Sequence, residues 1–257
     1  QHSESYRKIR NTFRYLLGNL NDSYNDLNLE EINLSELPEL EKLMLHKIYC
    51  LNSSFNRYFG NYDFHNLYKD LLNFCTVDLS AFYFDIRKDT LYCDTLSSQK
   101  RKSTLLILNI ILQCLLKWFA PILSFTTEEI YQLVSKKKNS IHLENFLNVP
   151  KKFENLELNE KWSQLLKIRD ICNLSIEEKR ASKEIGSSLE AAITIKINKQ
   201  KHKILEGIDF AELCITSSAE IKFHDTEEIE VQTNKAQGNK CPVCWKISIE
   251  PCQRHGS

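Results

Sequence analysis

The sequence predicts a mainly α protein: a helical bundle, then a small α+β domain, then a C-terminal knuckle of cysteine and histidine. Three observations predict this order. Apolar residues recur at helical spacing through the first two thirds of the chain, and the spacing changes to strict alternation after Gly186. The C-terminal end carries Cys241-Pro-Val-Cys244 and Cys252-Gln-Arg-His255. The domains that we expect are 1–158, 159–233 and 234–257.

The helices follow from apolar residues three and four positions apart and from residues that begin or end helices. We expect Pro38 in a first turn, Asp63 as an N-cap, and Gly60 and Pro121 at helix ends. The polar stretch from Lys136 to Asn159 predicts a long surface connection. The expected helical segments are Tyr6–Leu20, Leu37–Tyr58, Phe64–Ile86, Ser103–Phe119, a short helix opened by the capping pattern Thr126-Thr127-Glu128-Glu129, and Trp162–Ser182.

The second domain begins where every other residue is apolar. Ala191, Ile193, Ile195 and Ile197 alternate with polar or small residues, which predicts a half-buried strand. Shorter apolar runs predict three further strands and a short helix. The expected strands are Leu213–Thr216, Ile221–His224 and Ile229–Gln232, and the expected helix is Lys201–Glu206.

Composition limits the class of protein. The 257 residues carry 34 basic and 34 acidic side chains, so net charge does not favour nucleic acid, and any such binding must use local patches. The most apolar stretch, Thr104–Phe119, is interrupted by polar residues, so we expect no membrane span and no membrane partner. The first residues lack the apolar core of a signal peptide.

The nine cysteines favour a reducing compartment. Several stand singly in apolar patterns, where a reduced thiol packs as a small hydrophobic group: Cys50, Cys75, Cys114, Cys172 and Cys214. No catalytic constellation accompanies them. The sequence has no phosphate-binding glycine loop, no dinucleotide fingerprint and no nucleophile elbow, so we expect the chain itself to be non-catalytic.

The C-terminal knuckle has the spacing of a metal site. A turn that closes over two residues brings both thiolates of Cys241 and Cys244 to one side, as a tetrahedral metal requires. Cys252 and His255 would complete four soft or borderline ligands, which favours one zinc ion. Four protein ligands leave no open position for water, so the zinc would be structural. The alternatives are three protein ligands plus a water, or a truncated site.

Several segments together resemble a known family. Tyr6-Arg-Lys-Ile-Arg-Asn-Thr-Phe-Arg-Tyr-Leu-Leu-Gly-Asn-Leu-Asn-Asp22 is similar to the helix that opens the anticodon-binding domain of bacterial-type isoleucyl-tRNA synthetases, which are class I aminoacyl-tRNA synthetases. The resemblance covers nearly the whole chain. It continues through Asn61–His65, Asn73–Asp85, Lys88–Cys93, Ala120–Ile130, Lys183–Ala191 and the terminal Cys-x-x-Cys-Trp.

The resemblance implies a parent enzyme that uses ATP to attach isoleucine to tRNA(Ile), with a separate domain that hydrolyses misacylated valine. The His-Ile-Gly-His and Lys-Met-Ser-Lys-Ser signatures that handle ATP in that family have no counterpart here. The chain would therefore supply tRNA selection, docking the anticodon stem and loop. The resemblance also implies a cytoplasmic monomer that works with upstream catalytic and editing domains.

The family usually has Cys-x-Arg-Cys where this chain has Cys252-Gln-Arg-His255, and a longer loop before it. Two alternatives to the ligase fragment stay open: a freestanding zinc-containing RNA-binding module, and a protein-interaction bundle without affinity for RNA.

Contact with an anticodon loop requires planar groups that stack on bases and cations that hold phosphates. Trp245, beside the expected zinc site, is the expected aromatic group. The other candidates for tRNA contact are cations on the first helix, lysines of the surface connection, and the family-like turn before the first strand. These residues are Arg7, Arg10, Arg14, Lys136, Lys137, Lys183, Ser187 and Ser188.

Overall fold

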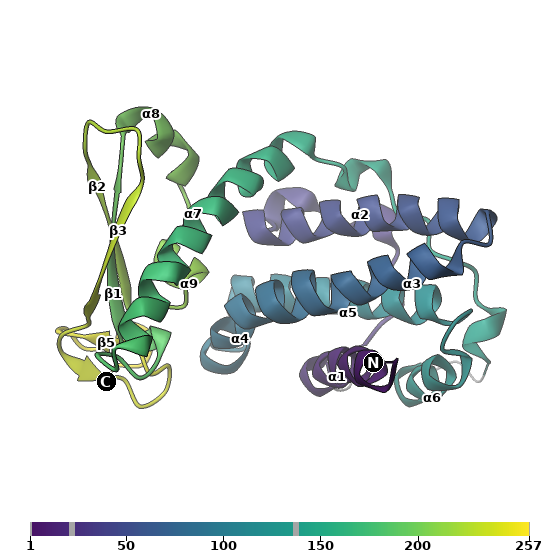
Figure 1. The fold of residues 1–257 in the computed structure, drawn as a ribbon. Helices are drawn as coiled ribbons and strands as arrows, with labels where there is room; N and C mark the ends of the chain where they lie inside the picture. Colours follow the sequence, from purple (N-terminus) through teal and green to yellow (C-terminus); the bar gives the residue numbers. More distant parts are fainter. Residues whose placement is uncertain (1, 21–23, 136–138, 257) are drawn as a thin grey trace. The chain divides into compact units, whose positions relative to one another are not determined.

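A computed structural model describes residues 2–20, 24–135 and 139–256 (Figure 1). Its chain divides into two compact units, Gln1–Leu156 and Glu157–Ser257. The first unit is helical, and the second holds a long helix, a small sheet and the cysteine-rich end. The mainly α class with a small C-terminal sheet and a Cys/His cluster is confirmed. The finer division into 1–158, 159–233 and 234–257 stays a prediction.

The first unit is a bundle around one central helix. Helix α5 contacts α1, α2, α4 and α6, and nearly all of its residues from Ile107 onward are buried. A π-helix, η4, connects α3 to α4, so one helical rod runs from Phe64 to Cys93. The bundle elements are α1 (His2–Leu20), α2 (Glu39–Gly60), α3 (Phe64–Asn73), η4 (Phe74–Tyr83), α4 (Phe84–Cys93), α5 (Gln99–Phe119) and α6 (Ser124–Val134).

Helix α5 is the one helix among the described residues that is long and apolar enough to cross a membrane by length and composition. Its most apolar window is 78% buried inside the bundle. The apolar stretch Thr104–Phe119, which polar residues interrupt, therefore forms the core of the bundle. Trp118 is fully enclosed, and its indole N–H donates to Asn52 Oδ1 at 3.1 Å.

Most helix boundaries follow the sequence signals. Asp63 caps α3 as predicted, because its Oδ1 accepts from the N–H of Asn66. We expected Pro38 in the first turn of α2. It is instead the N-cap residue, one position before the helix begins. The capping pattern at Thr126 was wrong, since α6 begins at Ser124 and Thr127 is buried with its hydroxyl bonded to Leu123 O.

The connection after α6 is ordered by short helical turns where the structure describes it. Glu128 Oε2 accepts from the hydroxyl of Ser140 and the N–H of Ile141, which fixes the return of the chain to α6. These contacts hold the pKa of Glu128 below its ordinary value. The 3₁₀ turns of the first unit are η2 (Leu29–Glu31), η3 (Leu34–Glu36), η5 (Ile141–Leu143) and η6 (Lys151–Phe153).

The second unit packs the long helix α7 (Leu156–Ala181) on a three-stranded sheet of order β2-β1-β3. Strand β1 (Ala191–Ile197) is parallel to β2 (Ser218–Phe223) and antiparallel to β3 (Glu230–Lys235). Its alternate residues are buried, as the period of two predicted. The remaining elements are η7 (Ser188–Glu190), α8 (Lys199–His202), η8 (Lys203–Leu205), α9 (Phe210–Leu213), β4 (Asn239–Lys240) and β5 (Ile247–Ser248).

Two expectations, one in each unit, were wrong or incomplete. The strand expected at Leu213–Thr216 is the end of helix α9 and a turn, because Asp209 caps the helix and Ile215 adopts a φ of 57°. A short apolar run does not by itself separate a strand from a helical turn. In the first unit, Cys50 is exposed, whereas the other cysteines expected to be buried are buried.

Candidate metal centre and nucleic-acid interface

Four side chains at the C-terminal end converge on one point. The ligand atoms of Cys241, Cys244, Cys252 and His255 all lie within 4.8 Å of one another. The Nδ1 atom of His255 is 3.4 Å from Cys241 Sγ and 3.3 Å from Cys252 Sγ. Cys244 Sγ is 3.8 Å from Cys252 Sγ. The structure therefore brings together the four residues that the sequence singled out.

These separations fit a single tetrahedral ion. With metal–sulfur bonds of about 2.3 Å and metal–nitrogen bonds of about 2.0 Å, the edges of the tetrahedron are about 3.8 Å and 3.5 Å. The Cys244–Cys252 S–S distance and both N–S distances from His255 lie close to those lengths. This Cys/His cluster can hold a metal ion, and Nδ1 is the nitrogen of His255 that faces the cluster.

A tight hairpin presents the first two ligands. Strands β4 and β5 pair Asn239 with Ser248 and Lys240 with Ile247, and Trp245 N–H donates to Cys241 O at 3.0 Å. Cys241 N–H in turn donates to Lys246 O at 2.9 Å. These bonds close the loop that carries both thiols.

The hairpin depends on a glycine that sequence reasoning missed. Gly238 has a φ of 117°, and a Cβ atom there would lie 2.1 Å from Ser248 O. Ile247 N–H donates to Ser217 Oγ at 2.7 Å, which ties the hairpin to the residue directly before β2 in the same unit. An isolated glycine ahead of a knuckle was the sequence signal that could have revealed it.

The surroundings of Cys244 and Cys252 shift the pKa values of their thiols in opposite directions. Burial raises the pKa of the Cys244 thiol. Burial acts on Cys252 in the same direction, but the backbone N–H groups of Arg254 and His255 donate to its sulfur and leave its pKa below the ordinary value. Cys252 is thus better prepared than Cys244 to be a thiolate before any ion binds.

Trp245 lies directly after the first pair of cysteines and is 59% exposed. Its backbone adopts a φ of 64°, in the left-handed region that non-glycine residues rarely occupy. The ammonium group of Lys240 lies 5.4 Å from the centroid of the indole ring, within cation–π range. The arrangement gives a broad, largely exposed ring with a positive charge beside it, and Lys240 was not among the residues predicted to matter.

The arginines predicted on the first helix lie on the solvent side of α1. Arg7, Arg10 and Arg14 are all exposed, while Ile9 and Phe13 of the same helix are buried in the bundle. The stripe therefore offers exposed positive charge.

The turn between α7 and β1 holds three further candidates. Lys183 is exposed with a φ of 60°, and its N–H closes the end of α7 by donating to Arg180 O at 3.0 Å. Ser187 is exposed and Ser188 is half-buried. Lys136 and Lys137, predicted to contact tRNA, lie outside the described residues.

Comparison with known proteins identifies the family. The family model for the anticodon-binding domain of tRNA ligase matches residues 41–196. The chain is 63% identical to isoleucine–tRNA ligase of Pelagibacter ubique (strain HTCC1062), with 99% of this chain and 28% of that protein covered. It is 41% identical to isoleucine–tRNA ligase of Bartonella henselae, with 95% of the chain and 26% of that protein covered. With that of Agrobacterium fabrum (strain C58) the identity is 39%, over 96% of the chain and 26% of that protein.

The chain thus spans little more than a quarter of the length of the curated relatives it matches. The family model begins inside α2 and extends through the bundle and α7 into β1. It covers most of the chain, and the relatives extend the similarity to nearly all of it. The chain belongs to the family of anticodon-binding domains of tRNA ligases.

Proposed function

We propose that this chain is the part of an isoleucine–tRNA ligase that binds the anticodon stem and loop of tRNA(Ile). The whole protein would use ATP to attach isoleucine to that tRNA, through catalytic and editing domains that this chain does not contain. The observation that carries the proposal is the 63% identity to an isoleucine–tRNA ligase across 99% of the chain. The work of this part would be selection of the RNA, in a cytoplasmic monomer.

The proposed RNA contacts divide into cations and one stacking group. Arg7, Arg10 and Arg14 are exposed on one side of α1 and would neutralise phosphates. Trp245 would stack on an unpaired base, with Lys240 holding the neighbouring backbone. Lys136, Lys137, Lys183, Ser187 and Ser188 are proposed to contribute further backbone contacts.

We propose zinc as the ion of the Cys/His cluster, held by Cys241, Cys244, Cys252 and His255. Thiolate and imidazole ligands in a tetrahedral set favour zinc over calcium or magnesium, which prefer oxygen. All four positions are filled by protein, so the bound ion would stabilise the knuckle. The knuckle in turn would fix the position of Trp245, one residue after the second ligand.

The test is a titration of the zinc-loaded chain with tRNA(Ile), with tRNA(Val) and tRNA(Met) as competitors, at two salt concentrations. We expect tighter binding of tRNA(Ile) and a strong loss of affinity at the higher salt, because phosphate contacts release counterions. Equal binding of all three tRNAs would favour a freestanding RNA-binding module. Absence of binding at both salts would favour a protein-interaction bundle.

Single substitutions separate the two kinds of contact. Replacing Arg10 with Ala should reduce the slope of log affinity against log salt concentration by about one. It should weaken the binding of all three tRNAs to the same extent. Replacing Trp245 with Ala should weaken binding about tenfold and leave the salt dependence unchanged. Lys222→Ala is the control, because Lys222 is exposed on β2 and pairs with Glu220.

A further inference from the structure

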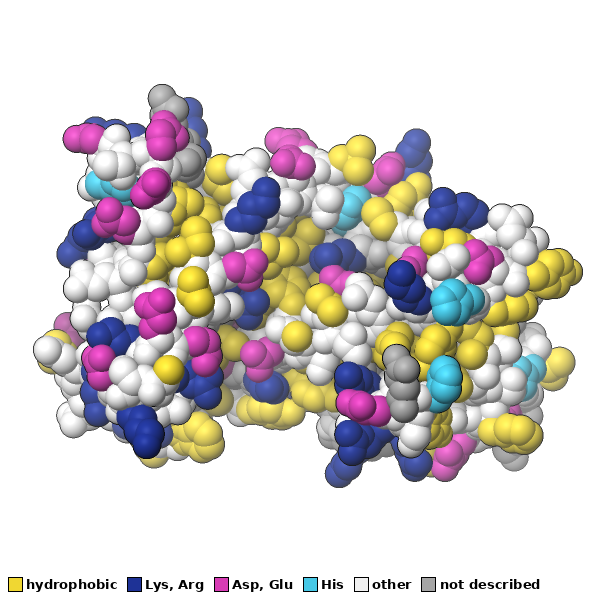
Figure 2. All heavy atoms as spheres, in the orientation of Figure 1, with side chains coloured by type: hydrophobic (Ala, Val, Ile, Leu, Met, Phe, Trp, Pro, Cys, Tyr) yellow, Lys and Arg dark blue, Asp and Glu magenta, His cyan; other side chains and the backbone are white. Residues whose placement is uncertain are grey.

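A run of aromatic rings leads from the core of the bundle to the surface at the corner between α2 and α3. Trp118 and Phe55 are buried, with ring centroids 6.2 Å apart, and Phe55 stacks on Phe59 at 5.6 Å. Phe64 meets Phe59 edge to face at 6.0 Å, and Tyr62 meets Phe64 at 6.4 Å. Figure 2 shows hydrophobic side chains protruding at this end of the bundle. The outermost ring is therefore supported by a continuous packed series.

The backbone holds Tyr62 outward in an unusual conformation. Its φ is 57°, its N–H donates to Phe59 O at 3.2 Å, and the next N–H, of Asp63, donates to Tyr58 O at 2.8 Å. These two bonds form a Schellman motif, in which glycine is the usual residue at the left-handed position. On the other side Asp63 caps α3 through the N–H of Asn66. The tyrosine is thus fixed from both sides at a position that disfavours a side chain.

The ring itself is open. Tyr62 is 83% exposed, more than Trp245 at 59%. Its plane makes 64° with that of Phe64, so the two rings are not stacked face to face. A face large enough for a nucleobase is therefore available on a rigid support, whereas a tyrosine selected only for packing would turn toward the core.

Two basic side chains flank the carboxylate of Asp63 at this corner. Arg57 and His65 are exposed and lie close enough to Asp63 to act on its carboxylate, and the guanidinium of Arg57 lies 4.8 Å from the ring of Tyr58. An aromatic ring beside a guanidinium is the combination that holds single-stranded nucleic acid: the ring stacks on a base while the cation faces the backbone. An apolar protein partner would favour a corner without charge.

We propose that Tyr62 is a stacking platform for one unpaired nucleobase of the bound RNA, with Arg57 facing the adjoining phosphate. The proposal rests on the proposed function. Tyr62, in the first unit, would be a second aromatic contact to the RNA, in addition to the contact proposed for Trp245 in the second unit. Tyr62 and Trp245 share the same combination of high exposure and left-handed backbone.

The test measures the affinity of the zinc-loaded chain for tRNA(Ile) with four variants. We expect Tyr62→Ala to weaken binding about tenfold and Tyr62→Phe to bind as the parent chain does, since a phenyl ring also stacks. Tyr62→Gly should fold, because glycine fits the left-handed position, and should bind as weakly as the alanine variant. Phe125→Ala is the matched control: Phe125 is 93% exposed on α6 of the same unit, and its loss should leave affinity unchanged.

A second readout locates the contact. Photocrosslinking with tRNA that carries 5-iodouridine in its loops should give a peptide modified at Tyr62. Full binding by Tyr62→Ala and Tyr62→Gly, with no crosslink at Tyr62, would overturn the platform while leaving the proposed function in place. Absence of tRNA binding by the parent chain would overturn both. Recovery of binding by Phe and loss by Ala and Gly would support the platform.

Discussion

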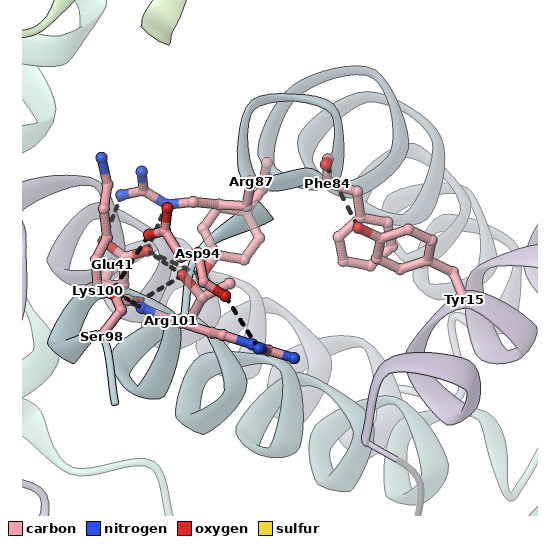
Figure 3. A network of polar contacts seen from close by, with 10 residues as sticks. Tyr15, Glu41, Phe84, Arg87, Asp94, Ser98, Lys100 and Arg101 are labelled. Atoms are coloured by element: carbon pink, nitrogen blue, oxygen red, sulfur yellow. Dashed lines mark hydrogen bonds and ion pairs between the residues drawn. The ribbon is translucent and has the colours of Figure 1, made fainter. Parts of the chain in front are cut away.

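The carboxylate of Glu41 and the guanidinium of Arg87 form a two-point ion pair inside the bundle. Arg87 Nε donates to Glu41 Oε1 and Arg87 Nη2 donates to Oε2, each at 2.7 Å (Figure 3). Both side chains are buried, and the hydroxyls of Tyr83 and Thr104 also donate to Oε1, at 3.2 and 3.4 Å. The pair joins α2 to the η4–α4 rod and to α5, so its geometry fixes how three bundle helices meet.

Removing one partner should be far more harmful than removing both. Arg87→Met leaves a buried carboxylate without its cation, and we expect a loss of about 3–5 kcal/mol in the free energy of unfolding. In the double variant with Glu41→Leu the loss should be much smaller, because no charge stays buried. Urea unfolding monitored by circular dichroism measures both.

An exposed ion pair provides the control for this experiment. Lys88 and Asp85 are 2.7 Å apart on the surface of α4, and Lys88→Met should cost less than about 1 kcal/mol. A double variant at Glu41 and Arg87 that is as unstable as Arg87→Met would contradict the explanation, since it would assign the loss to packing instead of the uncompensated charge.

His46 should make the bundle less stable in mild acid. It is buried, and its Nδ1 accepts from the N–H of Asn155 at 3.0 Å, a bond that requires an unprotonated nitrogen. Burial lowers the pKa of His46, and Lys47 lowers it further, against the opposing effect of Glu154. The unfolded state therefore takes up the proton first, and the contribution of His46 is complete above about pH 6.5 and lost as pH falls below it.

The measurement is the free energy of unfolding at pH 7.5 and pH 5.5 for the parent chain and for His46→Gln. The parent should lose up to about 1.4 kcal/mol for each pH unit below its unfolded-state pKa, and the glutamine variant should lose less. Identical slopes for the two proteins would show that other groups cause the acid sensitivity.

The sequence predicted regular structure best where one signal repeats. The alternation at Ile193 and Ile195 specifies which face of β1 is buried, and the spacing of cysteines specifies a cluster. The sequence was misleading where tertiary contacts determine where a helix begins. Thr127 resembles a capping residue, but it is buried in the first turn of α6. The exposure of Tyr62 was equally hidden, because its left-handed backbone depends on hydrogen bonds that a residue pattern does not encode.

Removal of the metal should unfold the knuckle and spare the bundle. The hairpin that carries Cys241 and Cys244 consists of two-residue strands, too short to be stable without the ion. The first unit has its own buried core around α5. Amide NMR spectra before and after chelation should lose the dispersed signals of residues 239–255 and retain those of the bundle.

His255 decides between four protein ligands and three. We expect His255→Ala to weaken zinc binding by at least tenfold and His255→Cys to keep it, because a thiolate can occupy the same tetrahedral position. Competition with a chromophoric chelator measures both affinities. Unchanged affinity in the alanine variant would favour a site of three cysteines and a water.

Gly238 should be as necessary to the knuckle as a ligand, although it binds nothing. A Cβ at this position would lie 2.1 Å from Ser248 O and 2.5 Å from the N of Ile249, and both are backbone atoms that cannot turn aside. We therefore expect Gly238→Ala to separate β4 from β5 and weaken zinc binding at least tenfold.

Gly207→Ala is the control for backbone strain alone, because Gly207 also has a positive φ, of 77°, but no atom within 4 Å of the added methyl group. That variant should lose about 1 kcal/mol of stability and keep its zinc affinity. Equal zinc affinities in both variants would mean that the hairpin relaxes around the methyl group, and that the close approach of Gly238 to Ser248 does not hold the ligands in place.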